Sequence, residues 1–431
     1  MRNLSDLFEK SLDAPRLNWI RRVADESAAL GFPVYIVGGF VRDLLLRRKV
    51  KDFDIVVEGD AITLGKALAK EFGGKLTIHP KFGTASWSLP EELTSGTGIN
   101  DTLDLISARS EIYTHPGALP TVKRSMITED LRRRDFTVNA MAIRLDGNRF
   151  GELLDPFGGR TDLGRGSIRV LHPRSFVDDP TRMLRAVRYE GRHGFRIDSE
   201  TLALVPEARP LVNNVSAQRI RHELDLILEE PNATSILARL AELDLLQPVH
   251  PALRWDQTAK AHVEQAVSSA HTIHNFSIRN LRWLLWLMPL SKNEIESINK
   301  RLLFTANLLK SLLASAKIYA NLTSLAGLKP SECVEQLDEF PLPAVYAVSL
   351  GGPNSRSRRM LEKYISEWRH VKPHVGGHDL KNLGLLPGPQ YQKILRRLRA
   401  AWLDGEITSA SQESAFLRNL FSVDHENTKQ G

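Results

Sequence analysis

The pattern of hydrophobic and polar positions changes along the 431-residue chain. Up to about residue 165, short runs rich in β-branched residues alternate with helical patterns. We predict a helix over 61–73, a hairpin over 140–156 that turns at Asp146-Gly147, and strands at 34–37, 53–57, 84–89 and 103–106. These elements predict a mixed α+β domain at the start of the chain.

From about residue 175 the strand pattern fades and helical periodicity continues towards the C-terminus. We expect the helices to break where Pro and Gly gather, at 206–210, 229–233, 328–332 and 351–357. The apolar run 280–290 is shorter than a membrane-spanning helix, and it predicts a buried helix. The fold class is therefore α+β: a small mixed sheet with helices, followed by an elongated all-α part.

Composition narrows the classes of partner. The net charge of +7 favours an anionic partner such as nucleic acid, although many basic proteins bind none. A single cysteine, Cys333, excludes a disulfide framework and a zinc site built from cysteines. The first residues carry acids and lack the apolar core of a signal peptide. We therefore expect a cytoplasmic protein with no membrane partner, and the sequence indicates no protein partner.

The first chemical motif is "YIVGGFVRDLLLRRKVKDFDIVVEGD" at 35–60. Gly38 and Gly39 follow a predicted strand, where glycines let backbone N–H groups approach a phosphate. Asp52 and Asp54 stand at i and i+2 on the next strand, so both should point to one side. Adjacent carboxylates repel unless a cation compensates them, and Mg²⁺ prefers such oxygen ligands. The alternative is a pair of solvated aspartates on an edge strand.

A third carboxylate is a candidate for the same site. Asp104 stands between Leu103 and Leu105 in a predicted strand, where an acid opposes the apolar pattern. It is either a catalytic partner of the first two aspartates or an outward-facing strand residue.

The second motif is "EDLRRRDFTVNAMA" at 129–142. Arg133 and Arg134 could hold a phosphate by bidentate hydrogen bonds. Asp135 and Asn139 are one helical turn apart, and their side chains suit a ribose hydroxyl. The alternative is a charged helix start in which both residues act as caps.

The third motif is "DDPTRMLRAVRYEGRHGF", which begins at Asp178. Arginines recur in it and just beyond it every three or four residues, at Arg182, Arg185, Arg188, Arg192 and Arg196. Such a stripe suits a polyphosphate or an RNA backbone, or it is a solvated helix face. Asp179 and Arg182 are helix neighbours, and an acceptor beside a donor matches the pairing edge of cytosine or adenine, whereas guanine and uracil present the opposite polarity. A helix cap at Asp178 and Asp179 is the alternative.

These motifs together resemble the tRNA nucleotidyltransferases of the CCA-adding type, a branch shared with bacterial poly(A) polymerases. The resemblance rests on "GGFVRD" with "DFD", on "RRDFTVNAMA", on "DPFGGRTDLGRGSIRVL", on "DDPTRMLRAVRY" and on "SAQRIRHEL", in this order. A C-terminal segment at 378–409 resembles a tail found in a subset of the family. The resemblance implies four domains: a catalytic head at 1–165, a neck at 166–235, a body at 236–330 and a tRNA-binding tail at 331–431.

The resemblance also implies roles for the motif residues. Asp52 and Asp54 would bind Mg²⁺ and activate the 3′-hydroxyl of tRNA in a two-metal phosphoryl transfer from CTP or ATP, with Asp104 as a further catalytic candidate. The base would be read by Asp179 with Arg182, without a nucleic-acid template. The other nucleotide-binding residues would be Gly38, Gly39, Arg42, Arg134, Asp135, Asn139, Arg185 and Arg188.

Two departures and three hypotheses remain open. The base-selecting motif usually begins Glu-Asp, whereas this chain has Asp178-Asp179, and Gln218 stands where the family usually has Glu. The form of the variable segment 107–131, together with the tail, is most similar to enzymes that add only the terminal A, although CCA and CC addition stay possible. A poly(A) polymerase and a catalytically inactive RNA-binding protein are the alternatives. The absence of a long basic C-terminal tail argues against the first, and the presence of Asp52 and Asp54 argues against the second.

Overall fold

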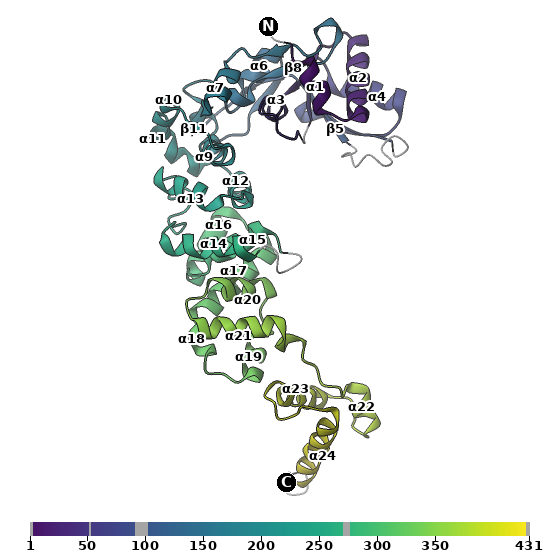
Figure 1. Cartoon of the computed structure of the whole chain (residues 1–431), viewed down its shortest axis with the longest axis vertical. Helices are drawn as coiled ribbons and strands as arrows, with labels where there is room; N and C mark the ends of the chain where they lie inside the picture. The colour runs from purple at the N-terminus through teal and green to yellow at the C-terminus, as the bar shows by residue number, and fades with distance from the viewer. Residues whose placement is uncertain (1–2, 51–52, 91–101, 270–275, 428–431) are drawn as a thin grey trace. The chain divides into compact units, whose positions relative to one another are not determined.

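The computed structural model describes residues 3–50, 53–90, 102–269 and 276–427. The chain forms two compact units (Figure 1): a head unit, Met1–Glu223 with Glu242–Val249, and a helical unit, Leu224–Ala241 with His250–Gly431. The predicted division into four domains is finer than these two units and stays a prediction. Within the described ranges, none of the helices combines the length and apolar character that a membrane crossing needs.

The head unit is built on a mixed sheet of seven strands among the described residues. Its order is β3-β4-β5-β2-β1-β8-β9, in which β2 and β5 run parallel and the other neighbouring pairs antiparallel. The strands are β1 (Val34–Val37), β2 (Asp54–Val57), β3 (Lys75–His79), β4 (Thr84–Ser88), β5 (Thr102–Ser107), β8 (Ala142–Arg144) and β9 (Leu153–Leu154). The four strands predicted from the apolar runs, the hairpin and the α+β class are thereby confirmed, and β3 is an addition.

The sequence explains the central elements locally. β1 is buried at all four positions and therefore lies in the middle of the sheet. α4 (Ala61–Phe72) begins where the Asp60 carboxylate accepts from the Ile62 N–H (3.0 Å), and it ends at Gly73, whose φ of 75° favours glycine. The predicted helix 61–73 is confirmed. α2 (Ala14–Ala29) packs beside it (Figure 1).

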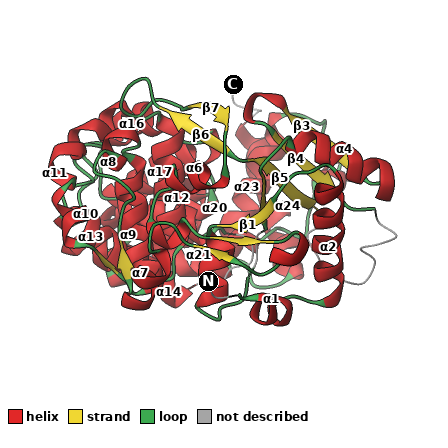
Figure 2. Ribbon diagram, turned by 90° about the horizontal axis from the view of Figure 1, so that it is seen from above, coloured by secondary structure: helices red, strands yellow, loops and turns green. Residues whose placement is uncertain are grey.

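The segment 107–131 holds a second, smaller piece of β-structure. β6 (Arg109–Ile112) and β7 (Thr121–Arg124) pair antiparallel in a sheet of their own, which Figure 2 shows as an arm apart from the main sheet. We call residues 109–124 the hairpin arm. α6 (Ile127–Arg132) follows it, and its N-terminal Ile127 N–H donates to Glu58 Oε1 (2.6 Å). The arm therefore leads directly into the second motif.

The rest of the head unit is helical apart from one short pair of strands. β10 (Ser167–Ile168) and β11 (Arg196–Ile197) pair in parallel, so the predicted arginine stripe ends within α9 and Arg196 lies on a strand. The helices are α1 (Ser5–Ser11), α3 (Gly39–Leu45), α7 (Gly159–Arg165), α8 (Ser175–Asp178), α9 (Thr181–His193), α10 (Ser199–Ala203) and α11 (Val205–Ala208), with α12 (Ala217–Glu229) beginning in this unit. The break predicted at 206–210 is confirmed, because α11 ends at Ala208 and the 3₁₀ helix Arg209–Asn214 follows it. The two prolines of the segment stand in the first turns of these elements, where no N–H is needed.

The helical unit contains the other three predicted breaks, which the helix ends confirm. Its helices are α13 (Ala233–Glu242), α14 (Gln257–Ser269), α15 (Ile278–Leu287), α16 (Lys292–Leu302), α17 (Ala306–Ala320), α18 (Leu322–Leu325), α19 (Pro330–Leu337), α20 (Leu342–Gly351), α21 (Ser355–Ser366), α22 (Gly377–Asn382), α23 (Pro389–Leu403) and α24 (Ala410–Asn427). The predicted buried helix at 280–290 is α15, buried from Leu281 to Leu287. Near the C-terminus, α22 and α23 share a small core around Leu380 and Leu398.

Candidate active site

A glycine turn connects β1 to α3. Gly38 has a φ of 69°, and its N–H donates to the Met141 carbonyl (3.1 Å). A Cβ at Gly38 would lie 2.6 Å from Nη1 of Arg134, so a side chain there would displace that guanidinium. A Cβ at Gly39 would meet Arg42 at an ordinary 3.5 Å. The turn therefore favours glycine at the first position because of its backbone conformation, and a side chain there would also require Arg134 to move.

Two of the three predicted catalytic aspartates lie side by side. Asp54 begins β2 and is register partner of Asp104 on the parallel strand β5. Partners in register present their side chains on the same face, and both aspartates are exposed whereas Ile55 and Leu105 behind them are buried. Ser86 Oγ donates to Asp104 Oδ1 (2.5 Å) from the next strand. Asp54 and Asp104, which we call the carboxylate row, lie at the end of the sheet where β1 ends.

Asp52, the remaining member, lies outside the described residues. Among the residues that are described, no cluster of three or more metal-ligating side chains forms. The pair Asp54 and Asp104 nevertheless has the donor set that a hard divalent cation takes, namely carboxylate oxygens open to solvent. The residues present therefore fit Mg²⁺.

The side chains of the second motif are fixed by hydrogen bonds to other elements. Asn139 ends the 3₁₀ helix Thr137–Asn139, and its Oδ1 accepts from Arg42 Nη1 (2.6 Å). Its Nδ2 donates to Asp135 Oδ1 (3.0 Å), so the predicted pairing of these side chains is present in a tighter turn than an α-helix. All three side chains are buried. The arrangement joins the first motif to the second.

Asp135 is the centre of a buried ionic chain. Arg185 donates to its Oδ2 from Nη2 (2.5 Å) and Nε (3.0 Å), and the same guanidinium pairs with Glu223 (3.2 Å). Glu223 also pairs with Arg188 (3.5 Å). Burial alone would raise the pKa of Asp135, but the charge of Arg185 and hydrogen bonds from Asn139 and Arg185 lower it to about 2. The carboxylate is therefore ionised at neutral pH.

One aromatic ring contacts three of these arginines. The guanidinium carbons of Arg42, Arg185 and Arg188 lie 5.4, 5.6 and 5.2 Å from the centroid of Tyr189. Phe136 meets the same ring edge-on at 5.7 Å. Cation–π attraction of this kind adds to hydrogen bonding and restricts long side chains. Tyr189 therefore helps to hold the arginines of the first and third motifs in place.

Asp179 and Arg182 stand at the junction of α8 and α9. Asp179 Oδ1 accepts from Thr181 Oγ1 (2.6 Å) and the Thr181 N–H (3.1 Å). Arg182 donates from Nη1 to Ser175 Oγ (2.6 Å) and from Nη2 to the Arg133 carbonyl (2.7 Å). Hydrogen bonds to neighbouring residues thus orient the side chains of both predicted base-reading residues, Asp179 and Arg182.

The arginines of the second motif are held by two acids. Asp130 accepts from Arg133 (2.7 Å) and Arg134 (3.0 Å), and Glu111 accepts from Arg133 (2.9 Å) and from the hydroxyl of Tyr113 (2.9 Å). Burial would raise the pKa of Asp130, but the charges of Arg134 and Arg133 lower it below its ordinary value. The hairpin arm thereby supplies two side chains that the motif reading did not include.

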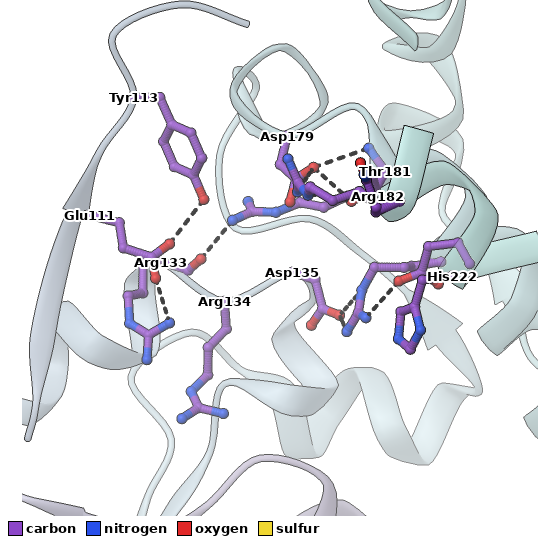
Figure 3. A pocket seen from close by; sticks show the side chains of 13 residues that line it. Glu111, Tyr113, Arg133, Arg134, Asp135, Asp179, Thr181, Arg182 and His222 are labelled. Carbon is purple, nitrogen blue, oxygen red and sulfur yellow. Dashed lines mark hydrogen bonds and ion pairs between the residues drawn. The ribbon is translucent and has the colours of Figure 1, made fainter. Parts of the chain in front are cut away.

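These groups surround one pocket of about 480 Å³ (Figure 3), a size that suits a small ligand. Five arginines and four carboxylates are among its lining residues, so the excess of positive over negative side chains favours an anionic ligand. The lining consists of Glu111, Tyr113, Arg133, Arg134, Asp135, Asp179, Thr181, Arg182, Arg185, Gln218, Arg219, His222 and Glu223. In Figure 3 Glu111 and Tyr113 enter from one side, and Asp179 and Thr181 stand on another.

The pocket unites part of the predicted site. Arg134, Asp135, Asp179, Arg182 and Arg185 line it. Three further predicted residues stand behind the pocket: Asn139 contacts its lining residue Asp135, Arg42 contacts Asn139, and Arg188 contacts the lining residue Glu223. Gly38 lies next to Arg134, and Gly39, Asp54 and Asp104 lie near the end of β1. Sequence analysis missed Glu111, Tyr113, Thr181, Arg219, His222 and Glu223 as site residues. The motif "SAQRIRHEL" was the available signal for three of them.

Comparisons with known proteins were made on sequence and on structure. The model of the "Poly A polymerase head domain" family matches residues 34–169, and that of the "Probable RNA and SrmB- binding site of polymerase A" matches residues 194–256. An A-adding tRNA nucleotidyltransferase of Halalkalibacterium halodurans is 34% identical over 97% of this chain and 96% of its own length. Another A-adding tRNA nucleotidyltransferase, of Geobacter sulfurreducens, is 32% identical over 96% of this chain, which spans about half (48%) of that relative.

Solved structures agree with these relatives. An apo structure of a CCA-adding enzyme superposes with a TM-score of 0.83 and 31% identity, covering 98% of this chain and 99% of the other. The Thermotoga maritima CCA-adding enzyme complexed with tRNA has a TM-score of 0.79 and 30% identity, covering 97% and 99%. The complex of a CCA-adding enzyme with ATP has a TM-score of 0.80 and 29% identity, covering 97% of this chain and 99% of the other. The complex with CTP has a TM-score of 0.80 and 30% identity, covering 99% and 98%. The chain therefore belongs to the class II tRNA nucleotidyltransferase and poly(A) polymerase family, and it is a nucleotidyltransferase of tRNA 3′ ends.

Proposed function

We propose that this enzyme adds the terminal adenosine of the CCA end. It would transfer AMP from ATP to the 3′-hydroxyl of a tRNA that ends in CC and release pyrophosphate. The observation that carries the transfer is the polar pocket in which Asp179 and Arg182 stand together above a chain of fixed arginines. The choice of adenosine is supported by the two A-adding relatives that match nearly the whole chain. CTP is the substrate to test beside ATP.

Base selection follows from hydrogen-bond polarity. Asp179 offers a carboxylate oxygen as acceptor, and Arg182 is a permanent donor. Adenine and cytosine present an amino donor next to a ring-nitrogen acceptor on the pairing edge, which complements this pair of residues. Guanine and uracil present a carbonyl where adenine and cytosine have the amino group, so the Asp179 oxygen would face another acceptor. The pocket should therefore refuse GTP and UTP.

The remaining binding residues act on the ribose and the triphosphate. Asp135 and Asn139 accept and donate beside the predicted ribose position, and they are oriented before any ligand binds because Arg185 and Arg42 hold them. The triphosphate would contact Gly38, Gly39, Arg134 and Arg185, with the buried Arg42 and Arg188 behind them. The positive charge of these arginines suits an anion with several phosphates. Orientation of these groups in advance lowers the entropy cost of binding.

The acceptor end would react beside the carboxylate row. Asp52 and Asp54 would hold Mg²⁺, with Asp104 as an additional carboxylate in register with Asp54. When bound, divalent ions stabilise the negative charge that develops on the attacking and leaving oxygens of phosphoryl transfer. Ser86 donates to Asp104 and so fixes the direction in which this carboxylate points. The aspartates would also orient the 3′-hydroxyl of the tRNA towards the α-phosphate.

An incorporation assay tests this proposal. The purified protein is incubated with Mg²⁺ and with tRNAs that end before the first C, after CC, or after CCA, and it is supplied with ATP, CTP or both. Addition of one A to the CC-ending tRNA alone is the expected result. Addition of C residues would show that the enzyme adds CC or CCA, and it would contradict the proposal that only A is added. Long A tails would identify a poly(A) polymerase, and no incorporation with any tRNA would refute the transfer itself.

A further inference from the structure

The two oxygens of the Asp179 carboxylate have different surroundings. Oδ1 accepts hydrogen bonds from Thr181 Oγ1 (2.6 Å) and from the Thr181 N–H (3.1 Å), and it forms an ion pair with Arg219 Nη2 (2.7 Å). In the parts of the chain that the structure describes, no hydrogen bond to Oδ2 forms. Two hydrogen bonds and an ion pair on one oxygen restrict the rotation of the carboxylate, and they leave the other oxygen as the acceptor that a ligand can use.

Arg219 supplies the only charged donor of this set among the described residues. It extends from α12, 40 residues away in the sequence, and its side chain is partly buried. Its Nη2 also lies 3.4 Å from Thr181 Oγ1, while Nη1 donates to the carbonyl of Gly117 (3.3 Å). The planar guanidinium thus bridges Asp179 and the hairpin arm, which a lysine ammonium could not do in the same geometry.

Gly117 lies between the two strands of the hairpin arm and makes a close backbone approach. Its φ is 77°, and a Cβ there would lie 3.1 Å from the carbonyl group of Asn214. Its N–H donates to the carbonyl of Asp178 (3.4 Å), next to the base-reading aspartate. A glycine is therefore required for the arm to reach both Asp178 and Arg219. The arm, Arg219 and Asp179 form one contiguous set of contacts.

We infer that Arg219 is a specificity-determining residue, which positions Asp179 so that only Oδ2 faces the base. This inference rests on the proposed function, in which Asp179 accepts the amino group of adenine or cytosine. Without Arg219 the carboxylate loses its charged donor and can rotate, so it no longer presents one fixed acceptor. The arm contributes by holding Arg219 through Gly117. Arg219 itself does not contact the base and acts through Asp179.

Single-turnover incorporation on a CC-ending tRNA tests the inference, with the ATP-to-GTP ratio of kcat/KM as the readout. Arg219→Ala is expected to lower this ratio about 10-fold or more, because the ion pair that orients the Asp179 carboxylate is lost. Arg219→Lys should restore part of the ratio, since it keeps the charge and loses the bridge to Gly117. Arg174→Ala is the matched control: this arginine is 76% exposed, pairs with Asp178 at 3.8 Å and leaves Asp179 untouched, so the ratio should not change.

A double-mutant cycle separates positioning from a general structural effect. In an Asp179→Ala background, Arg219→Ala should cause no further loss of the ratio if it acts through that carboxylate. Independent, multiplying losses would overturn the inference, and so would an unchanged ratio in Arg219→Ala or an equal loss in Arg174→Ala. If Arg219→Ala does not fold, Gly117→Ala provides the test, because it displaces the arm and keeps Arg219; an unchanged ratio there would overturn the inference. Failure of the wild-type enzyme to incorporate any nucleotide would instead refute the proposed function.

Discussion

The buried ion pair between Asp135 and Arg185 makes a quantitative prediction about stability. Asp135→Asn removes the charge and nearly keeps the shape of the side chain. The pKa of Asp135 is lowered from 3.8 to about 2 in the folded chain, a difference of about 1.8. That difference corresponds to about 2 kcal/mol of stability at pH 7. Because the side chain is buried, solvent screening does not reduce this figure much.

The pH dependence has a definite sign. The folded pKa lies below the unfolded one, so the stabilisation is complete above pH 3.8 and is lost as the pH falls through about 2. At pH 3 roughly half of the value at pH 7 should remain. The destabilisation caused by Asp135→Asn should therefore shrink by about half between pH 7 and pH 3.

Hydrogen exchange measured by mass spectrometry is the suitable assay, because peptides from β1 and α9 report on the head unit alone. Opening free energies of wild type and variant are compared at pH 7 and pH 3 after correction for intrinsic exchange rates. Glu129→Gln is the control: it removes an exposed partner 3.9 Å from Arg132, and we expect a change below about 0.5 kcal/mol. A loss for Asp135→Asn that is the same at both pH values, or no larger than the control, would refute the reasoning.

Three further predictions concern the turn, base selection and the helical unit. Gly38→Ala should destabilise the head unit by about 1–3 kcal/mol because φ is 69°, and thermal unfolding would measure this. It should also raise the KM for ATP several-fold in steady-state kinetics, because the new Cβ would lie 2.6 Å from Arg134 and displace it. Arg182→Ala should reduce discrimination against GTP and UTP, measured by misincorporation; unchanged selectivity would exclude it from base selection. Arg282→Ala should cost about 2–4 kcal/mol, because two carbonyls at the end of α12 lose their buried donor (2.6 and 2.7 Å), whereas the half-exposed Arg279→Ala should cost less than about 1 kcal/mol; urea unfolding compares the two variants.

Local pattern was sufficient for the main strands and for some of the chemistry. Apolar runs bounded by turn residues identified β1, β2, β4 and β5, and an acid within an apolar run singled out Asp104. Its position next to Asp54 could not be derived in the same way, because it depends on which strands pair and in which register. β3 and the hairpin arm were missed since their strands are short and polar, with alternating or exposed positions.

Contacts between distant motifs were also beyond the sequence. The three-to-four spacing placed Arg182, Arg185 and Arg188 on one face of a helix, but spacing does not tell whether a face is solvated or interior. The structure buries Arg182 and Arg188, and partners from other elements, among them Ser175 and Glu223, make that burial possible. Such pairings join residues that lie far apart in the chain, and a single sequence does not record them.

The central claim is that the aspartates at the end of the sheet perform nucleotide transfer to tRNA. Its most direct test is transfer of labelled AMP from ATP to CC-ending tRNA by wild type and by Asp54→Ala, with the affinity for tRNA measured in parallel. Asp54 is exposed at the first position of its strand, so the fold should tolerate alanine there. We predict that the variant transfers no measurable AMP while binding tRNA nearly as tightly as the wild type. Transfer at the wild-type rate, or equal loss of binding and transfer, would contradict the account.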